Sequence, residues 1–115
     1  MYGSSTPEIS VEELGRLLAE DRRDRQFVDV REPQELEMAK LAGFQNLPLS
    51  KFAEWSADIH DQLNSDHEIV VMCHHGMRSA QMCQWLISQG FSNVRNVAGG
   101  IDAYSAVVDP SIPRY

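Results

Sequence analysis

The sequence predicts an α/β domain in which a largely parallel sheet carries helices on both faces. Apolar runs at 26–30, 69–72 and 94–97 alternate with segments whose apolar residues recur at helical spacing. Strands that alternate with helices form parallel sheets, and both faces of such sheets are covered. A length of 115 residues suits one hydrophobic core. We therefore expect a single domain over residues 1–115.

The first part of the chain predicts two strands, each followed by a helix. Ile9 belongs to a short strand, and Ser10 begins a capping box with Glu13 at the start of a helix. Residues 26–30 form the second strand. A proline in the first turn favours a short helix over 33–36.

The middle of the chain predicts a strand end at 46–48 and then a helix that Ser50 caps. The apolar residues that give this helix its spacing are Phe52, Trp55, Ile59 and Leu63. We expect Trp55 to pack in the core rather than to bind a ligand.

The last part predicts a strand over 69–72, a helix over 78–89 that Gly90 ends, and a strand over 94–97. The apolar side of that helix carries Ala80, Cys83, Leu86 and Ile87. Prolines favour an extended tail over 105–115, and we expect residues 1–7 to be flexible.

Composition excludes several classes of partner. The formal net charge is −7, with 10 basic against 17 acidic residues, so a surface for nucleic acid or an anionic membrane is not expected. The sequence has no signal peptide and no apolar run long enough to span a membrane. We expect a cytoplasmic protein.

Two cysteines are too few for a disulfide scaffold, so their surroundings decide their roles.

The segment from Cys73 to Ser79 carries the chemistry. Cys73 ends an apolar run and is followed by a short loop and a predicted helix. Backbone N–H groups and the helix dipole favour negative charge at such a position, so we expect a thiolate. In open parallel sheets, ligands bind beyond the carboxyl ends of the strands. The strand ends at 29–31, Cys73 and Gly99 are therefore expected to converge.

The run Cys-His-His-Gly-Met-Arg-Ser at 73–79 resembles the active-site loop of the rhodanese, or thiosulfate sulfurtransferase, superfamily. Further similar segments lie at 27–32, 41–48 and 97–104, so the resemblance covers most of the chain. It implies a five-stranded parallel sheet and an enzyme that moves a sulfane sulfur through a persulfide on Cys73. It implies no cofactor.

The resemblance also assigns roles to the site residues. Cys73 is the nucleophile, and Asp29 with Arg31 braces the active loop from the neighbouring strand. Arg78 and the backbone amides of the loop bind the anion. The loop residues are His74, His75, Gly76, Met77 and Ser79.

Sulfur donors and acceptors are implied only as classes. The donor is thiosulfate or a protein persulfide, and the acceptor is a thiophile. Residues 108–115 look like the end of rhodanese domains that are fused to adenylyltransferases, which pass sulfur to small carrier proteins. Such a carrier protein is a candidate partner.

Two other functions stay open. The fold serves as a binding or regulatory module if Cys73 is unreactive. A phosphatase or arsenate reductase is disfavoured because four residues separate Cys73 from Arg78, whereas cysteine phosphatases resemble a Cys-x5-Arg loop with a wider ring of N–H donors.

The remaining candidate residues are expected to be structural. Cys83 and Trp85 belong to the apolar side of a helix, and His60 and His67 to the surface. We predict no metal, because adjacent histidines at 74–75 seldom share one ion and the chain has no Cys-x2-Cys or His-x3-His partner.

Overall fold

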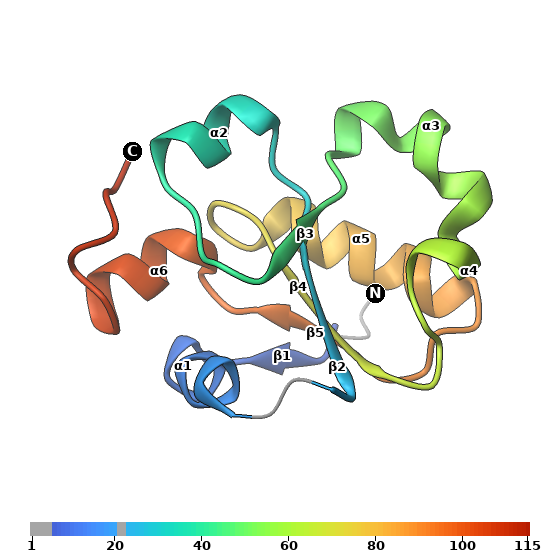
Figure 1. Ribbon diagram of the computed structural model, residues 1–115, viewed down its shortest axis with the longest axis horizontal. Coiled ribbons are helices and arrows are strands. Elements are labelled where there is room, and N and C mark those ends of the chain that lie inside the picture. Colours follow the sequence, from blue (N-terminus) through green and yellow to red (C-terminus); the bar gives the residue numbers. More distant parts are fainter. Residues whose placement is uncertain (1–5, 21–22) are drawn as a thin grey trace.

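A computed structural model describes residues 6–20 and 23–115. In chain order the elements are β1 (Glu8–Ile9), α1 (Val11–Ala19), β2 (Arg25–Asp29), α2 (Pro33–Met38), β3 (Phe44–Asn46), η1 (Leu49–Lys51), α3 (Phe52–Trp55), η2 (Ser56–Asp58), α4 (Ile59–Gln62), β4 (Glu68–Met72), α5 (Met77–Ser88), β5 (Val94–Val97) and α6 (Gly100–Val107) (Figure 1). None of the helices in this described part is both long and apolar enough to cross a membrane.

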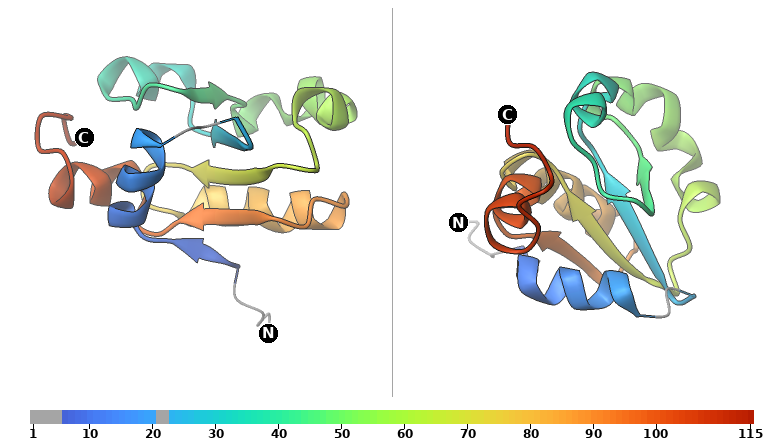
Figure 2. Two further views of the ribbon diagram at one scale, coloured as in Figure 1. Left: turned by 60° about the horizontal axis from the view of Figure 1, so that its bottom comes forward. Right: turned by 60° about the vertical axis from the view of Figure 1, so that its left-hand side comes forward.

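The described residues form a sheet of five strands in the order β1-β5-β4-β2-β3. Every neighbouring pair is parallel, which confirms the predicted fold class. Figure 2 shows α1 and α6 against one face of the sheet and α5 against the other. Parallel pairing puts the carboxyl ends of the strands at the same edge.

Two apolar layers follow from the alternation of side chains along the strands. In β4, Ile69 and Val71 face α3, α4 and α5, whereas Val70 and Met72 face α1 and α6. All four residues are fully buried. The continuous apolar run that predicted β4 is therefore explained by burial on both faces.

The helix predicted from Ser50 to residue 63 is wrong in form. The chain makes four one-turn segments there, η1, α3, η2 and α4. Ser50 caps none of them, because its hydroxyl bonds to the carboxylate of Glu32. Trp55 is nevertheless buried as predicted, and its indole N–H donates to the carbonyl of Pro48 at 2.9 Å.

Helix α5 confirms the predicted helix and its end at Gly90, which has a φ of +100°. Its inner face differs from the prediction. Cys83 and Leu86 are buried, but Ile87 is 41% exposed and Ala80 is only partly buried. The other buried residues of the helix are Ser79 and Met82. Cys83 is thus a core residue, and burial raises the pKa of its thiol to about 12.

The prediction of an extended tail over 105–115 needs a correction. Residues 105–107 belong to α6, and a turn at 110–112 brings the rest of the tail back onto the domain. The hydroxyl of Ser105 bonds to the carbonyl of Ile112. The prediction of a flexible segment over 1–7 lies mostly outside the described residues, which begin at Thr6. The carbonyl of Pro7 accepts from the N–H of Asn96 at 2.8 Å.

Gly100 allows α6 to begin directly against the Cys73 loop. A Cβ at Gly100 would lie 2.4 Å from the carbonyl oxygen of His74, and the residue has a φ of +64°. Gly90 has a similar left-handed conformation but open space around it. A substitution at Gly90 therefore introduces conformational strain alone, whereas one at Gly100 introduces the same strain together with a collision with the backbone.

We predict that Gly90→Ala lowers the free energy of unfolding by about 1 kcal/mol, the cost of the left-handed conformation. Gly100→Ala should lower it by at least about 3 kcal/mol, because the collision adds to that strain. Urea unfolding of both variants measures the difference. Equal losses in the two variants would contradict the close approach of α6 to the loop.

Candidate active site

The predicted convergence of strand ends is found between the Cys73 loop and the start of α6. Cys73 follows β4, and Gly99 and Gly100 follow β5. The backbone N–H of Ile101 donates to the carbonyl of Cys73 at 2.9 Å, and that of Asp102 donates to the carbonyl of His74 at 3.1 Å. The first turn of α6 thus fixes the backbone at the start of the loop.

Polar groups surround the sulfur of Cys73. The backbone N–H of Gly76 donates to Sγ at 3.0 Å, and the hydroxyl of Ser79 lies 3.2 Å from it. Gly76 has a φ of +108°, the left-handed conformation that glycine adopts at little cost. Gly76 is the N-cap of α5, so the helix dipole also favours negative charge near the sulfur.

Ser79 links the sulfur to a buried amide. Its hydroxyl donates to Oδ1 of Asn96 at 2.5 Å, and Nδ2 of Asn96 donates to the carbonyl of Gly76 at 3.0 Å. A hydroxyl has one proton, so Ser79 donates either to Asn96 or to Cys73. It can therefore turn toward the sulfur when negative charge develops there. Sequence reasoning missed Asn96, although a polar residue in the otherwise apolar strand 94–97 was a signal.

Arg78 is held by a carboxylate of α2. Its terminal nitrogens donate to both oxygens of Glu35, at 2.7 and 2.9 Å. The bond to Arg78 lowers the pKa of Glu35 to about 2, against burial, which raises it. The same bond raises the pKa of Arg78. Glu35 was missed from the sequence, where its only signal was a place in the first turn of a short helix.

Asp29 and Arg31 form a buried ion pair. Asp29 is 1% exposed and Arg31 is 0% exposed. The guanidinium donates to both carboxylate oxygens, with Nη2 to Oδ2 at 2.7 Å and Nε to Oδ1 at 3.0 Å. Burial lowers the pKa of Arg31, but the bonds to Asp29 and Tyr115 raise it by more, so the pKa is raised overall. Nη1 of Arg31 also donates to the carbonyl of Glu35 at 3.3 Å. The pair therefore supports α2, and through Glu35 it supports Arg78.

Arg114 and Tyr115 contact residues of the site. The ring of Tyr115 stacks on that of His74, with centroids 3.9 Å apart and planes 6° apart. Its hydroxyl accepts from Arg31 at 2.8 Å and donates to Glu35 at 2.9 Å. Burial raises the pKa of Tyr115. Arg114 adds an ion pair to Asp102 at 3.0 Å. Proline content predicted only an extended tail, so both contacts were missed.

A cavity of about 220 Å³ opens above the sulfur. Its lining residues are Cys73, His74, His75, Met77 and Arg78. Cys73 is 1% exposed and lies deep in the site, whereas Met77 is 78% exposed and His75 has a side chain that is 63% exposed. Both histidines face the cavity. The pKa of His74 is lowered, mainly by burial and to a smaller extent by the neighbouring imidazole of His75. Figure 1 shows the loop beside α2, α6 and the C-terminal segment.

The two tryptophans and His60 lie where they were predicted, in and beside the core and at the surface, whereas His67 differs from the prediction. Trp55 and Trp85 pack edge to face with ring centroids 5.9 Å apart, next to the core. His60 is exposed and stacks on Phe91. His67 is only partly exposed, and its Nδ1 is buried without a hydrogen-bond partner. Both cysteines of the chain are free thiols.

Cys73 is a free cysteine in a loop between the central parallel strand β4 and the N-terminus of α5, which is one of the common environments of reactive cysteines. The family model described as a rhodanese-like domain matches residues 10–107. The chain therefore belongs to the rhodanese-like domain family.

Relatives with curated names agree with this assignment. Rhodanese-like/PpiC domain-containing protein 12, chloroplastic, of Arabidopsis thaliana is 47% identical over 94% of this chain and 37% of its own length. A sulfurtransferase of Allochromatium vinosum is 34% identical over 85% of this chain and 87% of its own length. Adenylyltransferase and sulfurtransferase MOCS3-2 of Zea mays is 32% identical over 85% of this chain and 21% of its own length.

A solved structure shows the same fold. The rhodanese-related protein of Thermoplasma volcanium superposes with a TM-score of 0.75 at 28% identity, over 95% of this chain and 99% of that chain. The chain spans only 37% and 21% of the Arabidopsis and maize relatives. Relatives that carry the name sulfurtransferase support a sulfurtransferase-type role for the domain.

The depressed pKa of Glu35 makes the stability of the domain depend on acid pH. Its value in the fold is about 2, below its ordinary value of 4.5. A carboxylate of this kind stabilises the fold above pH 4.5, and that stability is lost as the pH falls toward 2. We predict that the free energy of unfolding of the wild type falls over this range, and that Glu35→Gln removes part of the fall.

Urea unfolding between pH 2 and pH 6 measures the effect. Glu37→Gln is the matched control, because Glu37 is exposed on the same helix. It should keep the acid dependence of the wild type. An acid dependence in Glu35→Gln that is as steep as in Glu37→Gln would contradict the pairing of Glu35 with Arg78.

Proposed function

We propose that the domain is a sulfurtransferase in which Cys73 accepts a sulfane sulfur and passes it to a thiophilic acceptor. The observation that carries the proposal is the bond from the N–H of Gly76 to Sγ of Cys73, at the base of the cavity. This bond stabilises a negative charge on the sulfur, and membership of the rhodanese-like family supports the same chemistry.

The first half-reaction loads the sulfur. The Cys73 thiolate attacks the outer sulfur of thiosulfate with an electron pair, a new S–S bond forms, and the bond to the sulfonate group breaks. Sulfite leaves with the electrons of the broken bond. Cys73 becomes a persulfide anion, and no external oxidant or cofactor is needed.

The second half-reaction unloads it. Cyanide or a thiolate attacks the terminal sulfur of the persulfide, and the electron pair of the S–S bond returns to Sγ of Cys73. With cyanide the product is thiocyanate. The enzyme thus alternates between two covalent states, which gives ping-pong kinetics.

The loop holds the anionic states of this cycle. We assign this role to the amides over 74–79, with Arg78 at the cavity wall. Because both terminal nitrogens of Arg78 are bonded to Glu35, its charge is largely compensated. Amide dipoles therefore supply most of the stabilisation in our account. Asp29 and Arg31 act as positioning residues through α2.

The donor and acceptor are proposed as classes. A small or protein-bound persulfide fits as the donor alongside thiosulfate, because Met77 is 78% exposed at the rim and leaves an apolar approach to the cavity. A small sulfur-carrier protein is a candidate acceptor. The free thiols of Cys73 and Cys83 suit a reducing compartment such as the cytoplasm.

The two alternatives predict different outcomes. A binding module would have a folded loop and an unreactive Cys73. A phosphatase or arsenate reductase would hydrolyse or reduce an oxyanion, for which the Cys-x4-Arg loop is short. Loss of aryl phosphate hydrolysis in Cys73→Ser would favour that second alternative over sulfur transfer.

We predict thiocyanate formation from cyanide with thiosulfate or glutathione persulfide as the donor. Cys73→Ser should fall to the uncatalysed background, because its hydroxyl is a weak nucleophile at neutral pH. Cys83→Ala is the matched control and should retain turnover, since Cys83 is a core residue. The assay also varies both substrates to test for ping-pong kinetics. Turnover that survives in Cys73→Ser, or is missing with both donors in the wild type, would contradict the proposal.

A further inference from the structure

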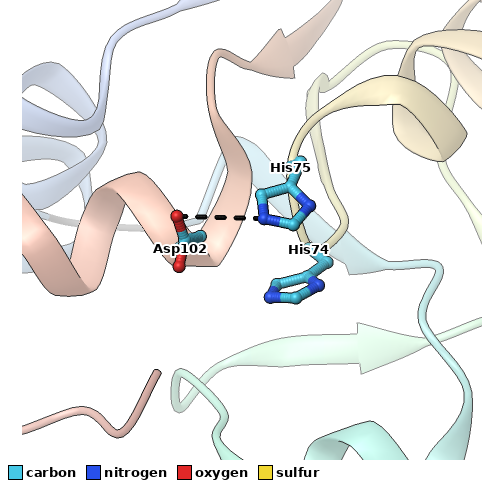
Figure 3. Close-up of side chains that lie close together, drawn as sticks. All are labelled: His74, His75 and Asp102. Atoms are coloured by element: carbon cyan, nitrogen blue, oxygen red, sulfur yellow. Dashed lines mark ion pairs between the residues drawn. The ribbon is translucent and has the colours of Figure 1, made fainter. Parts of the chain in front are cut away.

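Three side chains with metal-ligating atoms meet at the rim of the Cys73 cavity. Figure 3 shows His74 and His75 of the loop opposite Asp102 of α6. One ligand atom from each residue lies within 4.8 Å of those from the other two. Nε2 of His75 is 3.9 Å from Oδ2 of Asp102. Sequence spacing offered only the adjacent histidines, whereas the fold adds the carboxylate from the next helix.

The distances suit a small divalent ion after a modest closure. Zinc bonds to histidine nitrogen and to carboxylate oxygen are about 2.0–2.2 Å, so the ligand atoms of a tetrahedral site are about 3.3 Å apart. The side chain of His75 is 63% exposed, so a shift toward Asp102 would not disturb the core. Two imidazoles and one carboxylate are also a common protein donor set for zinc.

His74 supplies a second observation that points to a ligand. Its Nε2 is buried and has no hydrogen-bond partner. Buried polar atoms are nearly always bonded, so this nitrogen calls for an explanation. The ring of His74 is also held in place by its stacking on Tyr115, with ring centroids 3.9 Å apart.

Asp102 is also held from outside the cluster. Arg114 donates to Oδ1 and Oδ2, both at 3.0 Å. A carboxylate has about four lone-pair sites, so these bonds leave capacity for an ion. Hydrogen bonds of this kind orient ligating carboxylates in metal sites.

We propose that His74, His75 and Asp102 form a binding site for a zinc-like divalent cation, with its fourth position open at the rim of the Cys73 cavity. The site needs no sulfur ligand and does not depend on the sulfur-transfer reaction. Because His74 and His75 also line the cavity, a bound ion adds positive charge beside the thiol.

Zinc binding by the whole protein tests the proposal, measured by competition with a chromophoric zinc indicator in a buffer without thiols. The wild type and Cys73→Ser should each bind one Zn²⁺ with similar affinity. Asp102→Asn and His75→Ala should each weaken binding by at least about tenfold, since loss of even an outer-shell partner costs about 10–100-fold. His67→Ala is the matched control, because its Nδ1 is also buried and unbonded, and it should bind as the wild type does.

Each other outcome contradicts the site. Binding that is lost in Cys73→Ser but kept in Asp102→Asn would place the ion on the thiol. Binding unchanged in both Asp102→Asn and His75→Ala, or no binding by the wild type, would exclude this set of ligands. Circular dichroism and urea unfolding establish that each variant is folded, and His74 is left intact because its ring packs on Tyr115.

Discussion

The site depends on the contact between the Cys73 loop and the first turn of α6. Amides of that turn bond to the carbonyls of Cys73 and His74, and the approach is possible only because Gly100 has no Cβ. With those carbonyls fixed, the left-handed Gly76 turns its N–H toward the sulfur. A backbone contact between the ends of β4 and β5 thus creates the environment of the thiol.

A chain of polar contacts holds the other side of the loop. It runs from buried Asp29 through Arg31 to Glu35 and then to Arg78, with Tyr115 bonded to two of its members. Buried charges are tolerated only when paired, and removal of one partner commonly costs about 3–5 kcal/mol. Arg78 is therefore held firmly in position, but the charge of its guanidinium is largely compensated by Glu35. In the proposed cycle, stabilisation of anionic sulfur falls mainly to the amide dipoles of the loop and the N-terminus of α5.

Local patterns predicted the parts of the structure that local physics determines. Cys73 could be singled out because its apolar strand, glycine and following helix are contiguous in sequence. The bonds to Glu35 and Tyr115 join residues 43 and 80 positions apart, and no periodicity reports such contacts. The region after Ser50 was predicted as one helix because its apolar residues have helical spacing. The expected cap is missing because Ser50 bonds to Glu32, another contact between residues distant in sequence.

The central claim is that the sulfur of Cys73 accepts a second sulfur atom. Intact-mass measurement of the wild type after incubation with thiosulfate or glutathione persulfide, followed by peptide mapping, tests it most directly. We expect a gain of one sulfur atom on Cys73 that cyanide removes. No gain with either donor, from folded protein whose Cys73 is still alkylated by iodoacetamide, would contradict it, and so would sulfur that maps to Cys83.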